Sequence, residues 1–164
     1  MAKRSRKLMC YYPDEEVVGV KIVPTVKAVS GRSLEDITKI RPTQVHYSES
    51  MSVFGMSLND GQKVIGGDEY DCNKTETMPS KLRRIDVIFQ SDEQMFHSIV
   101  FYGETTLRIG QPEQQSILGD LRGSRVESFV MEPGEELLGC EIHHGRMCTY
   151  GIVWLTWQPV KPER

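Results

Sequence analysis

The stretch that decides the fold is IDVIFQSDEQMFHSIVFYG, residues 85–103. In its first part, Ile85, Val87 and Phe89 alternate with Asp86 and Gln90, with Ile88 breaking the pattern, which is the period expected when one face of a β-strand is buried. In its second part, residues 96–102 are largely apolar on both faces, which is typical of a strand inside a packed sheet. The polar residues between the two parts predict a turn, so the stretch predicts an antiparallel pair of strands.

A second stretch resembles the first at an offset of about 41–42 residues. Residues 126–131 predict a strand, the sequence EPGE at 132–135 a turn, and residues 137–143 the partner strand. Glycine follows each copy, at Gly103 and at Gly145. A repeated antiparallel unit lets each copy cover the apolar face of its neighbour, and the chain has room for three such units.

The remaining chain also contains short strand patterns separated by turn residues. A β-branched run at residues 17–23 lies between two prolines, and Asn-Asp-Gly at residues 59–61 predicts a hairpin turn. Residues 33–40 carry the one helical pattern, and Pro42 limits it to one or two turns. Short strands at a spacing of ~8–12 residues predict an all-β fold of antiparallel strands, in a β-prism, a β-sandwich or a barrel. Further strands are predicted at residues 45–47, 53–58, 63–65 and 150–157.

The chain of 164 residues has the length of one domain. We expect a basic N-terminal arm at residues 1–12, a single β domain at 13–160 and a C-terminal tail at 161–164. We also expect no membrane insertion, since no run approaches the ~20 apolar residues that a membrane helix needs. The basic start has no apolar run behind it and is not a secretory signal, which predicts an intracellular and most often cytoplasmic chain.

Charge separates the arm from the body of the chain. The formal net charge is −3, yet Lys3, Arg4, Arg6 and Lys7 make the first ten residues positive. The body is therefore acidic and lacks the clustered Lys and Arg residues that bind nucleic acid. We expect any contact with nucleic acid to be limited to the arm. Like charges repel, so we expect the arm to become ordered only on an acidic surface, and its deletion to leave the stability of the domain nearly unchanged.

Cys140, His143, His144 and Cys148 carry the donor atoms of a zinc site. Their spacing opposes such a site, because alternation along a strand points Cys140 and His144 to one face and His143 to the other. We therefore expect no metal, and these four residues remain zinc candidates only. Without a secretory signal, free thiols are the expected state of the cysteines, and a disulfide between Cys140 and Cys148 is the alternative.

Catalytic and cofactor motifs are missing from the sequence. It contains no nucleophile elbow, phosphate-binding loop or dinucleotide-binding turn. The spacing of His46 and His97 to the carboxylates selects no acid–base site. Residues 68–76 are rich in oxygen ligands but do not match the EF-hand spacing for calcium, so an acidic solvated loop is expected. We predict a protein that is not an enzyme and has no cofactor.

Aromatic residues near the strand ends are candidates for contacts with partners. Trp154 alternates with Ile152 and Thr156, so it is expected in the core. Trp157 lies on the opposite face of the same strand, which becomes an interface if that face is open. The predicted partner-binding residues are Lys3, Arg4, Arg6, Lys7, Tyr11, Tyr12 and Trp157.

The segment FVMEPGEELLG, residues 129–139, resembles the "strand, Gly-Glu, apolar, Gly" passage of jacalin-like lectins. Residues 85–89 and 98–103 resemble the other repeated strand pairs of that family, and residues 139–159 resemble its closing strand. The resemblance implies a three-sided β-prism. It also implies a sugar site at a closing-loop aspartate in a G-x-x-x-D pattern. In this chain the pattern reads GRMCT from Gly145, without the aspartate.

Two hypotheses for function remain. The first is a non-catalytic interaction module, a structural or accessory subunit that binds partner proteins in a larger assembly through its arm and strand edges. The missing aspartate and the arm favour it. The alternative is a jacalin-like carbohydrate-binding lectin module, with Arg146 and Tyr150 beside the closing loop as candidate sugar-binding residues.

Overall fold

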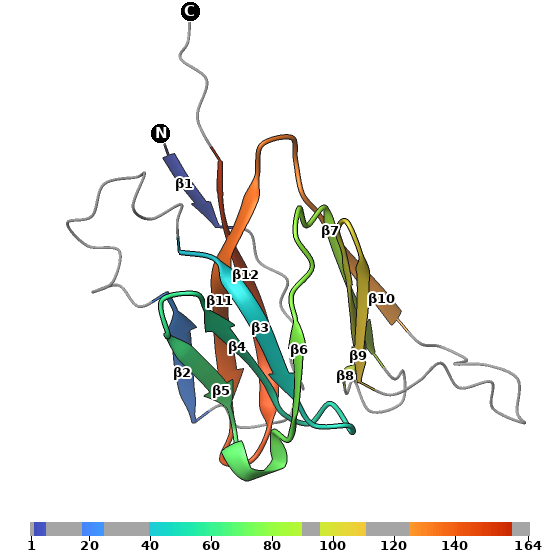
Figure 1. Ribbon diagram of the computed structural model, residues 1–164. Helices are drawn as coiled ribbons and strands as arrows, with labels where there is room; N and C mark the ends of the chain where they lie inside the picture. Colours follow the sequence, from blue (N-terminus) through green and yellow to red (C-terminus); the bar gives the residue numbers. More distant parts are fainter. Residues whose placement is uncertain (1, 6–17, 25–39, 90–95, 111–124, 159–164) are drawn as a thin grey trace, which may run out of the picture.

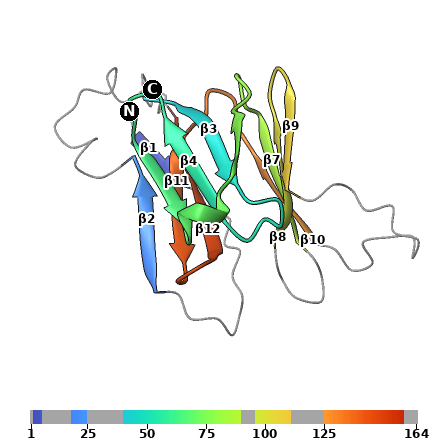
Figure 2. The same ribbon diagram turned by 60° about the horizontal axis from the view of Figure 1, so that its bottom comes forward.

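The computed structural model describes residues 2–5, 18–24, 40–89, 96–110 and 125–158. Within these ranges the chain forms three four-stranded antiparallel sheets, which surround a common hydrophobic core (Figure 1, Figure 2). In the described part, helix is limited to one 3-10 turn, η1 (Glu69–Asp71). The predicted all-β fold is confirmed. No helix in the described ranges is long and apolar enough to cross a membrane.

The strands of each sheet are adjacent in an order that differs from their order in the chain. The first sheet runs β1 (Ala2–Ser5), β12 (Thr149–Gln158), β11 (Glu136–His144), β2 (Gly19–Val23). The second sheet runs β10 (Arg125–Val130), β7 (Arg84–Phe89), β8 (Phe96–Tyr102), β9 (Thr106–Gly110). The third sheet runs β5 (Lys63–Gly66), β4 (Phe54–Leu58), β3 (Pro42–Tyr47), β6 (Lys74–Thr77).

Each sheet described here follows one rule, the Greek-key order in which the fourth strand returns beside the first. The rule is direct in the second sheet, where β7, β8 and β9 are successive neighbours and β10 returns beside β7. The third sheet repeats it with β3 to β6. The first sheet repeats it across the chain ends, with β11 and β12 followed by β1 and then β2. The described sheets therefore share one strand order, but the copy predicted at residues 126–143 is divided between two of them.

The predicted pairing inside the second repeat is wrong. The first repeat is correct, since β7 and β8 pair with Ile85 opposite Phe101 and Val87 opposite Ile99. In the second repeat, β10 pairs with β7, whereas β11 pairs with β12 and β2. The turn at residues 132–135 exists, with the N–H of Glu135 donating to the carbonyl of Glu132 at 2.9 Å, but it carries the chain from one sheet to the next.

The core joins the sheets through aromatic rings. Trp154 of β12 is fully buried and makes edge-to-face contacts with Phe54 of β4 and Phe101 of β8, each with ring centroids 6.0 Å apart. One ring therefore comes from each sheet of the described structure, and such contacts add to the burial of apolar surface. The predicted core position of Trp154 is confirmed.

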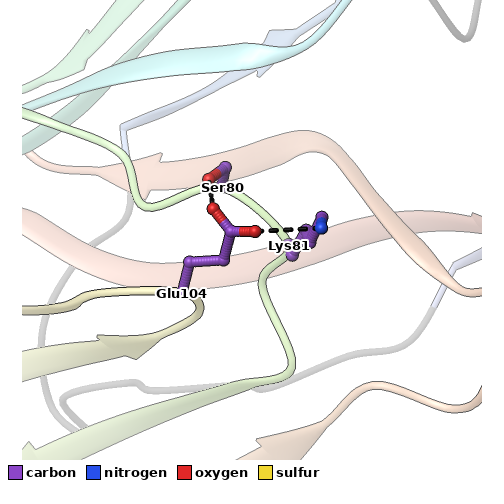
Figure 3. Close-up of polar contacts among 3 residues, drawn as sticks. All are labelled: Ser80, Lys81 and Glu104. Carbon is purple, nitrogen blue, oxygen red and sulfur yellow. Dashed lines mark hydrogen bonds and ion pairs between the residues drawn. The ribbon is translucent and has the colours of Figure 1, made fainter.

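The two ends of the prism are built differently. At the upper end in Figure 1, the turn after β8 is attached to the segment before β7. The Glu104 carboxylate accepts a hydrogen bond from the Ser80 hydroxyl at 3.0 Å and pairs with the Lys81 ammonium at 2.9 Å (Figure 3). At the lower end, connections from different sheets meet around η1. The helical turn predicted at residues 33–40 lies outside the described residues except for Ile40.

Candidate functional site

The connection between β11 and β12 is a tight turn at the lower end of the prism. The N–H of Gly145 donates to the carbonyl of Cys148 at 2.9 Å, which closes the turn. The Tyr150 ring packs on Gly145, where a Cβ atom would lie 2.3 Å from the ring, so a larger residue would have to displace the ring. Arg146 and Met147 are exposed at the tip. The predicted sugar-binding residues Arg146 and Tyr150 therefore lie at the same turn, although Tyr150 is half-buried.

Thr149 occupies the position of the aspartate in the G-x-x-x-D pattern, and its side chain points into the protein. Its exposed fraction is 1%. Its hydroxyl donates to the carbonyl of Gly66 at 2.6 Å and accepts from the N–H of Phe54 at 3.0 Å. Its own N–H donates to the carbonyl of Ser52 at 2.8 Å. Thr149 thus ties the turn to the third sheet and offers no group to a ligand.

The connection between β5 and β6 lies against this turn. Gly67 has a φ angle of 123°, a conformation that favours glycine, and a Cβ atom there would lie 2.6 Å from the carbonyl oxygen of Met147. The N–H of Asp68 donates to the same oxygen at 3.3 Å. The Asp68 carboxylate caps η1 by accepting the N–H of Tyr70 at 2.9 Å. This places the Tyr70 side chain, 95% exposed, on the surface.

The connection between β3 and β4 is the next neighbour at this end, since Ser52 accepts from Thr149. The hydroxyls of Ser48, Ser50 and Ser52 lie 3.0–3.3 Å apart. Met51 between them has a φ angle of 61° and is buried, with its side chain beside Gly110 of β9. This connection therefore contacts elements of the first, second and third sheets.

The zinc candidates do not form a site. Cys140 is fully buried in the core, and burial raises the pKa of its thiol well above the usual range. His143 points to the other face and pairs with Glu141, with Nε2 2.7 Å from Oε1. His144 places Nδ1 2.8 Å from the carbonyl oxygen of Gly145. Cys140 and Cys148 form no disulfide. Among the described residues, no three or more His, Cys, Asp or Glu side chains lie together as metal ligands.

The other histidines are on different sheets. His46 of β3 lies between the hydroxyls of Thr75 and Ser57, at 2.9 Å and 2.5 Å from its ring nitrogens. His97 of β8 is fully buried. Burial is the main cause that lowers the pKa of both imidazoles, with Lys63 adding to it at His46 and Arg108 at His97. The structure does not combine these two histidines into an acid–base site.

The predicted partner-binding residues are only partly within the described ranges. In β1, Lys3 lies opposite Trp157 and Arg4 lies opposite Thr156. Trp157 is half-buried, next to a small apolar cluster on the outer face of the first sheet that includes Leu138. The residues Arg6, Lys7, Tyr11 and Tyr12 lie outside the described residues.

Sequence reasoning missed how the lower end is assembled. It treated the loop after Gly66 as a separate acidic segment and the turn after Gly145 as the closing loop. The hydrogen bond from Thr149 to Gly66 spans 83 positions of sequence, so no local pattern reports it. The one signal available was the Gly66–Gly67 pair, because adjacent glycines mark a place where another backbone approaches closely.

No family model matches this sequence, and no curated protein is significantly similar to it. Solved structures do match. The second β-prism domain of RbmC from V. cholerae superposes with a TM-score of 0.54 at 12% identity, over 91% of this chain and 97% of that domain. The same domain bound to N-acetylglucosaminyl-beta-1,2-mannose matches with a TM-score of 0.53 at 13% identity, over 92% and 98%.

The V. cholerae biofilm matrix protein Bap1 matches with a TM-score of 0.56 at 13% identity, over 96% of this chain but only 24% of Bap1. The chain thus spans about a quarter of the length of that protein. These comparisons define the class: the fold is a β-prism, as the resemblance to jacalin-like lectins implied.

Proposed function

We propose that this domain binds carbohydrate at the lower end of the prism, where the β11–β12 turn meets the β5–β6 connection. The observation that carries the proposal is the likeness of 92% of the chain to a prism domain whose structure contains N-acetylglucosaminyl-beta-1,2-mannose. A fold supports many functions, so the site itself must provide suitable chemistry.

The exposed side chains at this end are of the kinds that bind sugars. Tyr70 offers an aromatic face for stacking on a pyranose ring, and Met147, 58% exposed, adds apolar surface on the neighbouring turn. Arg146 supplies several N–H donors, and the exposed Glu69 and Asp71 supply acceptors for sugar hydroxyls. Donors, acceptors and apolar surface therefore lie on two connections joined by a backbone hydrogen bond.

The missing aspartate shifts the ligand contacts away from the end of the closing loop. Thr149 stands in its place with a buried hydroxyl that is already hydrogen-bonded to Gly66 and Phe54. The β5–β6 connection, whose Asp68 N–H donates to the carbonyl of Met147, carries the exposed carboxylates of Glu69 and Asp71. We therefore assign the acceptor role to that connection and a donor role to Arg146.

Glycan-array screening followed by titration calorimetry tests the proposal, starting with N-acetylglucosaminyl-mannose glycans. Wild-type protein should bind, and Tyr70→Ala or Arg146→Ala should each weaken binding roughly tenfold, because a stacking contact or a charge-assisted hydrogen bond contributes about 1–2 kcal/mol. Matched controls at the opposite end and on another sheet are Lys81→Ala and Val130→Ala, which remove exposed side chains. Binding that is absent, or that the controls weaken equally, would contradict the proposal.

The protein-binding hypothesis rests on the N-terminal arm and on strand edges. Within the described residues only β1 represents the arm, and it pairs with β12 of the same domain. The similar solved structures agree better with the carbohydrate-binding alternative, so we place that function first.

A further inference from the structure

We infer that Thr149 is a positioning residue that fixes the β11–β12 turn on the third sheet. The inference deepens the proposed function and rests on it for its meaning, since the turn carries Arg146. The statement that Thr149 fixes the position of the turn does not depend on glycan binding. Thr149 holds the turn in one place and contacts no ligand itself.

The hydrogen bonds of Thr149 reach separate parts of the third sheet. Its hydroxyl links the beginning of β4, through the N–H of Phe54, to the end of β5, through the carbonyl of Gly66. Its N–H reaches the β3–β4 connection at Ser52. A hydroxyl both donates and accepts, so it serves both backbone groups at once, which a methyl group cannot do. With 1% exposure, water does not replace it.

The position of Thr149 makes these bonds matter for the site. Thr149 directly follows Cys148, whose carbonyl closes the turn, and Gly66 directly precedes Gly67, which touches Met147. The β11–β12 turn and the β5–β6 connection are therefore each adjacent to a residue of the same hydrogen bond, the one between the Thr149 hydroxyl and the Gly66 carbonyl. If it is lost, the hydrogen bond from the N–H of Asp68 to the carbonyl of Met147, at the longer distance of 3.3 Å, still links the turn to the β5–β6 connection.

The same strand offers a matched control. Thr156, near the other end of β12, is also fully buried, and its hydroxyl donates to the Glu135 carboxylate at 2.6 Å. Changing either threonine to valine keeps the shape and removes the hydroxyl. Both changes should therefore destabilise the domain, but only the change at Thr149 acts next to the β11–β12 turn.

The test compares Thr149→Val, Thr149→Ser and Thr156→Val by amide hydrogen exchange on ligand-free protein, with glycan affinity as a second readout. Thr149→Val should speed exchange at Gly145 and Asp68 roughly tenfold or more, the factor expected for losing a buried hydrogen bond. Thr149→Ser should restore protection, and Thr156→Val should leave these amides as in the wild type. Should Thr149→Val not fold, Thr149→Cys, with its weak S–H donor, replaces it.

Unchanged exchange at Gly145 and Asp68 in Thr149→Val, or failure of serine to restore it, overturns the inference. Equal effects of Thr156→Val overturn it as well, since they would reflect global stability only. A wild-type protein that binds no glycan would disprove the proposed function. The exchange result would still test the role of Thr149, because exchange is measured without ligand. Where the wild type binds, Thr149→Val should weaken binding about tenfold and Thr149→Ser should recover it.

Discussion

The second sheet and the first sheet have the same strand order but come from different parts of the chain. β7 to β10 lie within residues 84–130 and follow one another, so the second sheet forms from one continuous segment. The first sheet combines β11 and β12 with β1 and β2 from the opposite terminus. Contacts distant in sequence form more slowly and cannot be read locally. The difference shows that the alternation of apolar and polar residues specifies where strands form. The third face of the prism also requires pairing between segments that are distant in sequence.

The largest effect should come from the residue at which the sheets meet. Trp154 belongs to the first sheet, but its ring contacts Phe101 of the second and Phe54 of the third. Trp154→Ala should lower the free energy of unfolding by about 3–5 kcal/mol, measured by urea denaturation. Trp157→Ala, in the same strand but half-buried on the outer face, is the control and should cost clearly less. Equal losses would show that Trp154 is not the centre of the core.

The second sheet could be predicted in detail because its signals are local. The alternation of Ile85, Val87 and Phe89 gave the buried face of β7, and the apolar run at residues 96–102 gave a central strand, as β8 is. The fold class followed from the number and spacing of strands. The resemblance to jacalin-like lectins added the prism, which the solved structures confirm.

The first sheet could not be predicted in the same way. Residues 126–143 look like a hairpin, because two strand patterns flank a good turn, yet the two strands complete different sheets. Composition identified residues 1–12 as a charged arm, while the backbone of residues 2–5 pairs with β12. The lower end depends on Thr149, which a pattern marks only as a missing aspartate. Pairing is decided by the partner strand, and no single segment contains that information.

Deleting residues 2–5 tests how much the first sheet depends on a strand from the opposite end of the chain, in contrast to the second sheet, which forms from one continuous segment. The register runs from Ala2 opposite Gln158 to Ser5 opposite Leu155, so the deletion would leave β12 as an edge strand. We expect a loss on the order of 2 kcal/mol, from several backbone hydrogen bonds of about 0.5–1.5 kcal/mol each, where composition alone predicts almost none. Urea denaturation measures the loss, and light scattering should report association through the exposed edge.

The control for this deletion keeps the backbone and removes the charge. Lys3→Gln with Arg4→Gln should leave stability nearly unchanged, because it preserves the pairing of β1 with β12. If the deletion leaves the free energy of unfolding unchanged while the double substitution lowers it, the arm acts through its charge and β1 contributes little to the sheet.

A smaller effect should appear in the second sheet as pH falls. His97 is fully buried, and its Nε2 has no hydrogen-bond partner in the described structure. Burial, with Arg108 adding to it, lowers the pKa of His97 below 6.5, its ordinary value. The unfolded chain therefore takes up the proton more readily. The stabilising effect of the neutral ring is complete above pH 6.5 and is lost progressively as the pH falls below that value.

The free energy of unfolding should thus decrease as the pH falls below 6.5, and His97→Gln should make that decrease smaller. The pKa of His46 in the third sheet is lowered in the same direction and should account for part of the remaining slope. Measuring His46→Gln in the same way separates the contributions of His46 and His97 to the pH dependence of stability. An unchanged slope in His97→Gln would show that the buried ring does not resist protonation.

The smallest effect is expected at the upper end of the second sheet, where Glu104 attaches the β8–β9 turn to the segment before β7 (Figure 3). Lys81, and then Ser80, hold the pKa of Glu104 below its ordinary value of 4.5. The stabilisation is therefore present above about pH 4.5 and is lost as the pH falls through the lower folded-state pKa. Both side chains are largely exposed, at 53% for Glu104 and 80% for Lys81, so water and salt screen the pair.

Glu104→Gln should change stability at pH 7 barely measurably and should flatten only the acid end of the stability curve. Added salt should remove the remaining difference between variant and wild type, because exposed charges are screened within a Debye length. The amide of glutamine still accepts the Ser80 hydrogen bond, so the substitution isolates the charge. A loss at pH 7 that persists in high salt would instead assign the attachment of the turn to the buried contacts around it, since charge would then not be its cause.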